Sequence, residues 1–152
     1  MARINKNLSI ENARMIFLNF EGREEKYNRR GDRNFAVALE APLAEQLAAD
    51  GWNIKCIQPH DEYEEPLYYL PVAVSYSNIP PKVYLVTSRS KVLLDEDTVA
   101  QVDTLDIATT DLIITPYNWE VNGKSGVKAY LKTAYITIEE DEFAYKYDRG
   151  DM

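Results

Sequence analysis

Hydrophobic and polar side chains alternate with a period of two along much of this chain, which is the pattern of a half-buried β-strand. Residues 67–77 show the alternation most clearly. One face of that segment carries Tyr68, Leu70, Val72, Val74 and Tyr76. Apolar stretches of strand length also occupy residues 15–20, 34–39, 52–58, 82–87 and 91–94. The pattern therefore predicts a mainly β fold.

Two short segments break this pattern and are predicted to be helical. Residues 42–51 begin next to a Pro, place Leu43 and Leu47 one turn apart, and end with Gly, the order of signals expected around a helix. Residues 95–102 open with acidic side chains, which stabilise a helix N-terminus. Many short strands with two short helices predict a small all-β barrel rather than a βαβ sheet.

The last strands are predicted to form a long hairpin over residues 111–138. Asn122-Gly123 is a strong signal for a two-residue type I′ turn, which needs a positive φ at both positions and which sets the register of the strands. One face then pairs Val121 with Lys124, Trp119 with Gly126, Tyr117 with Lys128, Thr115 with Tyr130, and Ile113 with Lys132. The other face, predicted to be core, pairs Asn118 with Val127, Pro116 with Ala129, Ile114 with Leu131, and Leu112 with Thr133. The apolar positions change parity near Thr133, which predicts a bulge or a barrel corner there.

The first of these two faces interleaves aromatic rings with lysines, through Trp119, Tyr117, Tyr130, Lys128 and Lys132. Bases of single-stranded nucleic acid stack on such rings, while lysines neutralise the phosphates. Gly126 is expected to leave the indole face of Trp119 uncovered. The alternative interpretation is that the rings merely cover the sheet and the lysines extend into solvent.

Two further segments repeat this combination of rings and basic residues. The charged segment 21–33 is predicted to be a flexible loop or hairpin arm that closes over a bound strand, and a solvated loop is its simpler interpretation. A third cluster lies within residues 82–91. The candidate nucleic-acid-binding residues are Tyr27, Arg29, Arg30, Arg33, Lys82, Tyr84, Arg89, Lys91, Tyr117, Trp119, Lys124, Lys128, Tyr130 and Lys132.

The formal net charge of −8 would oppose contact with phosphates if it were evenly spread. Two stretches concentrate the acidic residues. Residues 61–65 hold four acids and no base, and residues 139–152 hold six acids and two bases. The rest of the chain is then neutral overall and can carry a basic face.

Three blocks resemble the single-stranded-DNA-binding proteins of tailed phages: MIFLNFEG at 15–22, KYNRRGDRNF at 26–35 and PYNWEVNGKSGVKAYL at 116–131. The resemblance extends over most of the chain. It implies an OB-fold-like architecture, a five-stranded or slightly elaborated Greek-key barrel. It also implies sequence-tolerant binding of single-stranded DNA in phage DNA replication or recombination, without enzymatic activity and without a cofactor.

The resemblance further implies that the acidic C-terminal segment recruits protein partners. The predicted organisation is a nucleic-acid-binding domain over residues 1–138 and an acidic tail over residues 139–152. The candidate partner-binding residues are Glu139, Glu140, Asp141, Glu142 and Phe143. Tails of this kind commonly end in an aromatic residue, whereas this chain ends in Asp151-Met152, which argues against docking through its last residue.

The remaining chemistry-bearing residues do not form a recognisable catalytic or metal site. Cys56 and His60 supply two ligands, fewer than the four of a structural zinc site. The sequence contains no Walker A, Rossmann or Gly-x-Ser-x-Gly motif. The acidic loop at residues 61–65 lacks the ligand spacing of an EF-hand. We therefore expect neither a bound metal ion nor a catalytic residue.

The single cysteine and the lack of a signal peptide or a membrane-length apolar run predict a cytoplasmic protein, in the host cytoplasm if a phage encodes it. An exposed strand edge would allow two copies to pair, so a homodimer is one expected assembly. Two other functions stand as alternatives. One is an acidic protein-interaction module that mimics DNA and inhibits a host protein, and the other is a hydrolase with scattered carboxylates.

Overall fold

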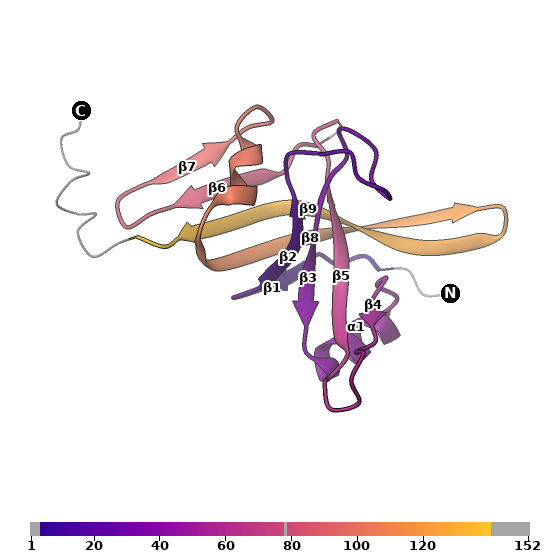
Figure 1. Cartoon of the computed structure of the whole chain (residues 1–152). Helices are drawn as coiled ribbons and strands as arrows, with labels where there is room; N and C mark the ends of the chain where they lie inside the picture. The colour runs from indigo at the N-terminus through magenta and orange to yellow at the C-terminus, as the bar shows by residue number, and fades with distance from the viewer. Residues whose placement is uncertain (1–3, 78, 141–152) are drawn as a thin grey trace.

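A single curled β-sheet forms the centre of this protein (Figure 1). The structure is a computed structural model, and it describes residues 4–77 and 79–140. The strands of the sheet are β1 (Leu8–Ile10), β2 (Arg14–Asn19), β3 (Arg33–Leu39), β4 (Lys55–Ile57), β5 (Leu67–Val74), β6 (Lys82–Val86), β7 (Lys91–Leu94), β8 (Ile107–Val121) and β9 (Lys124–Ile138). The strand order is β1-β8-β9-β5-β3-β2, with β4 beside β5 and with β6 between β9 and β7. The predicted mainly β fold is confirmed.

The hairpin of β8 and β9 extends well beyond the rest of the sheet (Figure 1). Its turn residues Asn122 and Gly123 have φ angles of 51° and 80°, both positive as a type I′ turn requires. The predicted register is confirmed from this turn back to the pair of Ile114 with Leu131. A local two-residue signal therefore set the pairing of most of the hairpin.

Beyond that point the predicted register is wrong by one residue. Ile113 pairs with Thr133 rather than with Lys132, and Leu112 pairs with Ala134 rather than with Thr133. The predicted bulge is present and places Lys132 as the extra residue of β9. The predicted register places the bulge after these two pairs along β9, whereas in the structure the bulge at Lys132 precedes both of them.

The second predicted helix, residues 95–102, is shorter and begins later, as the 3₁₀-helix η1 (Val99–Thr104). The carboxylate of Asp95 accepts hydrogen bonds from the backbone N–H groups of Asp97 and Thr98, at 2.9 and 3.0 Å. These hydrogen bonds to the Asp95 side chain compete with the backbone hydrogen bonds of a helix, so the helix begins only after this turn. The first predicted helix is confirmed as α1 (Ala41–Asp50).

Two strands differ from the prediction. The third predicted strand, residues 52–58, is shorter in the structure and corresponds to β4, because Trp52 takes part in the C-terminal cap of α1. Its backbone N–H donates to the Leu47 carbonyl at 3.0 Å, and its indole is buried in the core. The short strand β1 was not predicted, and it pairs with β8.

The core lies on one face of the sheet. The alternation predicted for residues 67–77 is confirmed at Leu70, Val72 and Val74, which are at most 4% exposed. The rings of Phe20 and Phe35 stack beneath them with their centroids 5.2 Å apart. On the opposite face of β5, Tyr69, Pro71 and Ala73 are partly exposed. Within the described residues, no helix is long and apolar enough to cross a membrane.

Candidate nucleic-acid interface

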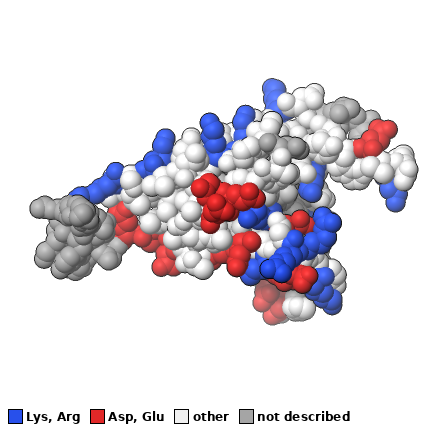
Figure 2. Space-filling view, turned by 90° about the horizontal axis from the view of Figure 1, so that it is seen from above, with Lys and Arg blue, Asp and Glu red and all other residues white. Residues whose placement is uncertain are grey.

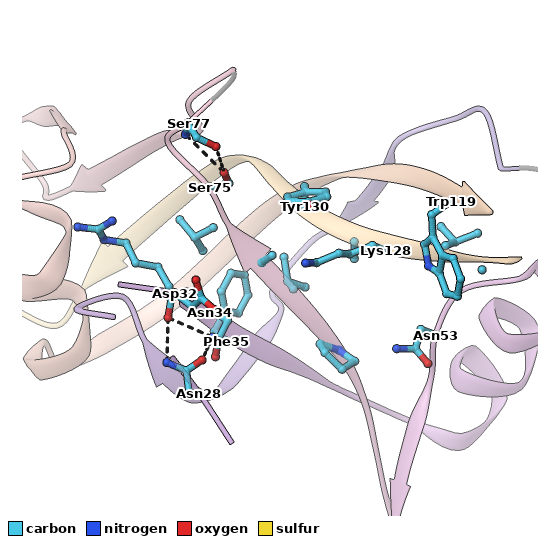
Figure 3. Close-up of a pocket in the computed structure, with 18 of the residues that line it drawn as sticks. Asn28, Asp32, Asn34, Phe35, Asn53, Ser75, Ser77, Trp119, Lys128 and Tyr130 are labelled. Atoms are coloured by element: carbon cyan, nitrogen blue, oxygen red, sulfur yellow. Dashed lines mark hydrogen bonds between the residues drawn. The ribbon is translucent and has the colours of Figure 1, made fainter. Parts of the chain in front are cut away.

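A groove lies where β5 crosses β9. The two strands share one parallel register pair, Ala73 with Tyr130, and diverge on either side of it (Figure 1). The groove has a volume of about 950 Å³ and is lined by β5, the β8–β9 hairpin, the end of α1 and the loop before β3. Figure 3 shows Trp119, Lys128 and Tyr130 projecting from the hairpin along one side of it.

Trp119 lies directly on Gly126, its partner across the hairpin. A Cβ atom at residue 126 would come within 2.8 Å of the indole Cζ2 atom, so the ring fills the space that the missing side chain leaves. The prediction that Gly126 leaves the indole uncovered is therefore wrong, because the ring packs onto the glycine backbone. The indole remains 38% exposed and lines the groove, so part of its surface is accessible to a ligand.

Lys128 and the neighbouring tyrosines form a compact group on the same face of the hairpin. The Lys128 ammonium lies 5.2 Å from the centre of the Tyr130 ring, a cation–π distance. Tyr117 meets Tyr130 edge to face, with centroids 6.0 Å apart. Within the described chain no carboxylate forms an ion pair with Lys128. The ammonium is therefore available to a phosphate.

The loop between β2 and β3 is held by internal hydrogen bonds. The side-chain amide of Asn28 donates to three backbone carbonyls of the loop, at 2.8 to 3.2 Å. Its oxygen accepts a hydrogen bond from the Asn34 amide at 2.7 Å. At the other end of the loop, the Asp103 carboxylate accepts from the backbone N–H groups of Phe20 and Glu21 and from the Arg23 guanidinium, at 2.7 to 3.1 Å. These hydrogen bonds join the loop to its own ends and to η1, and part of the loop lines the groove.

Two arginines line the groove, Arg29 in this loop and Arg33 at the start of β3. Arg33 lies 3.5 Å from the Glu96 carboxylate and 5.6 Å from the centre of the Tyr76 ring. The Nε atom of Arg33 and the Tyr76 hydroxyl are both buried without a hydrogen-bond partner among the described residues. Burial raises the pKa of Tyr76 above its ordinary 10.0, and the positive charge of Arg33 opposes that rise. The hydroxyl therefore stays protonated at neutral pH. Arg29 is more exposed and pairs with Asp32 at 3.3 Å.

The groove brings together five of the candidate residues, namely Arg29, Arg33, Trp119, Lys128 and Tyr130. The other nine do not line it: Tyr27, Arg30, Lys82, Tyr84, Arg89, Lys91, Tyr117, Lys124 and Lys132. Tyr27 is 90% exposed at the tip of the loop, with the Lys26 ammonium above its ring. The candidates therefore divide between the groove and the surfaces around it.

A second cluster forms where β6 pairs with β9. Tyr84 stacks on Tyr135 with a centroid distance of 5.1 Å and an interplanar angle of 10°. The Lys91 ammonium lies 4.9 Å from the centre of the first ring and 5.9 Å from that of the second. Tyr135 was missed because its parallel partner Tyr84 is distant in the sequence.

The groove also contains polar residues that the sequence analysis missed. They include Asn28, Asn53, Ser75, Tyr76 and Ser77. The polar residues directly after the buried strand β5 were the available signal, because binding residues often follow such strands. Asn53 had no such signal, since it reaches the groove only through the end of α1.

Positive and negative side chains are partly separated over the surface. Figure 2 shows Lys and Arg projecting in a row along one long edge and Asp and Glu gathered in the middle of this view, while both kinds of side chain are mixed in a cluster at the lower right. One edge of the molecule is therefore basic despite the net negative charge, and a basic edge is typical of nucleic-acid-binding proteins. No group of three or more His, Cys, Asp or Glu side chains placed to hold a metal ion occurs within the described part of the chain.

The first residues of the predicted acidic tail contact the folded sheet. The Glu140 carboxylate accepts hydrogen bonds from the backbone N–H and the hydroxyl of Ser88, both at 2.9 Å. These hydrogen bonds lower the pKa of Glu140 below its ordinary 4.5, and the Arg89 charge adds to the effect. The backbone N–H of Glu139 donates to the Asp106 carbonyl at 2.8 Å. The other predicted tail residues, Asp141, Glu142 and Phe143, lie outside the described residues.

Solved structures share this fold. The single-stranded DNA-binding protein from bacteriophage Enc34, in complex with ssDNA, aligns with a TM-score of 0.58 and 11% identity over 91% of this chain and 89% of that chain. A C-terminal truncation of the Enc34 protein aligns with a TM-score of 0.56 and 11% identity over 90% and 87% of the two chains. These likenesses show a common OB-like fold. Among curated protein sequences, none matches this chain.

A family model covers almost the whole chain. The model described as "Putative phage ssDNA-binding domain" matches residues 1–150. Its description names a binding domain rather than an enzyme, in agreement with the sequence prediction. This protein belongs to the family of phage single-stranded-DNA-binding domains.

Proposed function

We propose that this protein binds single-stranded DNA along the groove, with little preference for base sequence, and that it acts in phage DNA replication or recombination. The observation that carries the proposal is the meeting of two distant segments. Trp119, Lys128 and Tyr130 come from the hairpin, Arg29 comes from the loop before β3 and Arg33 begins β3, yet all five line one groove. Rings for stacking and cations for phosphates are the two requirements of this kind of binding.

The parts of the groove would divide the work between base and backbone. The accessible part of the Trp119 indole and the Tyr130 ring offer flat surfaces to bases. Lys128 is the groove cation without a carboxylate partner among the described residues, so we assign it the first phosphate. Arg29 and Arg33 would exchange their carboxylate partners for phosphate oxygens as the strand enters.

The cluster of Tyr84, Tyr135 and Lys91 extends the proposed contact surface beyond the groove. Its stacked rings and ammonium group repeat the chemistry of the groove on the neighbouring part of β9. Lys82 lies two residues before Tyr84 on β6, and alternation places both side chains on one face. A strand that leaves the groove toward β6 would meet this cluster.

Titration of the protein with homopolymeric oligonucleotides at several salt concentrations tests the proposal. Trp119 lines the groove and is partly exposed, so its fluorescence should be quenched on binding, whereas the buried Trp52 should contribute little. The affinity should fall as salt rises, with a logarithmic slope of about −0.7 for each neutralised phosphate. With three cations in the groove, we expect a slope of about −2 or steeper. Duplex DNA serves as the control. Absent quenching, or an affinity that does not depend on salt, would contradict the proposal.

Replacement of Gly126 by Ala is expected to weaken binding by up to about tenfold, less than the loss of a whole stacking ring. The new Cβ would lie 2.8 Å from the indole, so the ring must leave its place in the groove. Anisotropy of a labelled oligonucleotide measures the change. In a protein that already carries Trp119→Ala, the same substitution should have no further effect, because no ring remains to be displaced. An equal loss in both backgrounds would show that Gly126 acts through something other than the indole.

A further inference from the structure

Phe17 has an unusual position for a large apolar residue. Its φ angle is 53°, in the left-handed region that bulky side chains rarely adopt. It lies at an irregularity of β2, between the pairs formed by Ile16 and Asn19 with β3, and it is 56% exposed. The backbone is therefore strained to direct a phenyl ring toward solvent rather than into the core. Strain of this kind is typical of functional sites.

The Phe17 ring meets an aromatic partner on another strand. It contacts Tyr69 of β5 edge to face, with centroids 5.4 Å apart and planes at 82°. Strand β3 lies between β2 and β5, and its residues on this face are Ala36 and Ala38. Because these side chains are small, the two rings meet above β3 and form a raised aromatic surface.

Two cations flank this aromatic pair. The register places Arg14, Ala38, Tyr69 and Lys55 in one row across β2, β3, β5 and β4. Residues paired in register share a face, so Arg14 and Lys55 stand on either side of Tyr69. Both are exposed, and within the described chain neither forms an ion pair. As in the groove, aromatic rings lie beside cations, and here both cations lack a carboxylate partner among the described residues.

The aromatic pair is continuous with the groove along β5. Tyr69, Pro71 and Ala73 alternate with the buried residues of that strand, so they share its outer face. Pro71 and Ala73 line the groove. At about 3.3 Å per residue, Tyr69 lies about 13 Å from Ala73 along the strand. A single strand can therefore pass from the groove to the Phe17–Tyr69 pair over a floor of small side chains.

We infer that Phe17, Tyr69, Arg14 and Lys55 form a second base-stacking site, here called the Phe17–Tyr69 platform, which holds a further stretch of the same DNA strand after it leaves the groove past Pro71. The inference rests on the proposed function. The charge favours this occupant, since two unpaired cations beside an aromatic pair suit a polyanion with exposed bases. A second copy of a protein with net charge −8 would not require them.

Oligonucleotides of two lengths test the platform. A single OB fold covers about 4 to 16 nucleotides, so a 5-nucleotide strand is expected to fill the groove alone and a 15-nucleotide strand to reach the platform. Tyr69→Ala and Phe17→Asn should weaken binding of the longer strand by at least fivefold, measured by anisotropy of a labelled oligonucleotide, and leave binding of the shorter one unchanged. Asn tolerates the left-handed backbone, so Phe17→Asn removes the ring without adding strain.

Charge variants and a matched aromatic variant complete the experiment. Lys55→Glu should weaken binding of the longer strand and reduce its salt dependence, whereas Lys55→Arg should not. Tyr63 is 87% exposed in the acidic loop, so Tyr63→Ala should leave both affinities unchanged.

Failure of the platform can be told apart from failure of the proposed function. If the unmodified protein binds and Trp119→Ala weakens it, but the platform variants bind both lengths normally, the inference is overturned and the groove stands. If Phe17→Asn alters only self-association in sedimentation, the surface joins two copies and the inference is again overturned. If the unmodified protein binds neither strand, the proposed function itself fails.

Discussion

Trp119→Ala is expected to reduce the affinity for single-stranded DNA by about 5- to 150-fold, corresponding to about 1–3 kcal/mol for one stacked base. The indole is the larger of the two partly exposed rings of the hairpin that line the groove, and it is held in position by its contact with the Gly126 backbone. Removing it takes away both the stacking surface and the wall against which a base would rest. Anisotropy titration at fixed, moderate salt measures the loss.

The same variant separates stacking from folding. The indole is 38% exposed on the face of the hairpin that points away from the core, so the free energy of unfolding should change by less than about 1 kcal/mol. Trp119→Phe is the matched control, because it keeps a ring and should recover much of the affinity. Fluorescence quenching should nearly vanish in either variant, since Trp52 is buried. Unaltered affinity in Trp119→Ala would remove Trp119 from the binding site.

Asp103→Ala is expected to lower the free energy of unfolding by about 3 kcal/mol, as two or more hydrogen bonds to a charged group are lost. The carboxylate is 7% exposed, and it accepts hydrogen bonds from the backbone of Phe20 at 2.7 Å and of Glu21 at 3.0 Å. Its ion pair with Arg23, at 3.1 Å, would be lost as well. Urea denaturation measures the change in stability.

Binding should also weaken in Asp103→Ala, although Asp103 does not line the groove. The loop it anchors carries Arg29 and leads into Arg33 at the start of β3, and a loosened loop must be ordered again when DNA binds. Glu21→Ala is the control, because that exposed ion pair with Arg23 at 3.6 Å should contribute less than about 1 kcal/mol. If Asp103→Ala unfolds in the same urea concentration as the unmodified protein, the carboxylate does not hold the loop.

Local signals in the sequence predicted the elements whose cause is local. The Asn122-Gly123 turn set the hairpin register as far as Ile114, and the Pro and Gly around residues 42–51 delimited α1. The alternation in β5 identified the buried residues Leu70 and Val72. Short-range sterics and solvation decide each of these features, so they can be derived from a few neighbouring residues.

The predictions failed where distant segments meet. The parallel pairing of β6 with β9 places Tyr84 against Tyr135, and no neighbouring residue signals it. The hydrogen bonds of Asn28 and Asp103 join the loop before β3 to its own ends and to η1. The strained Phe17 was assigned to an ordinary strand, because its φ angle follows from the irregular pairing of β2 with β3.

The sequence by itself determined the fold class, the hairpin and the kinds of side chain available for contact with DNA, because periodicity, turn chemistry and composition are properties of short segments. Only the tertiary structure decided which of those side chains share a groove and where β9 acquires its bulge. It also decided that Phe17 and Tyr69 would meet across β3. These outcomes depend on pairings between residues far apart in the chain, and the free energy of such contacts is gained only once the whole sheet has closed.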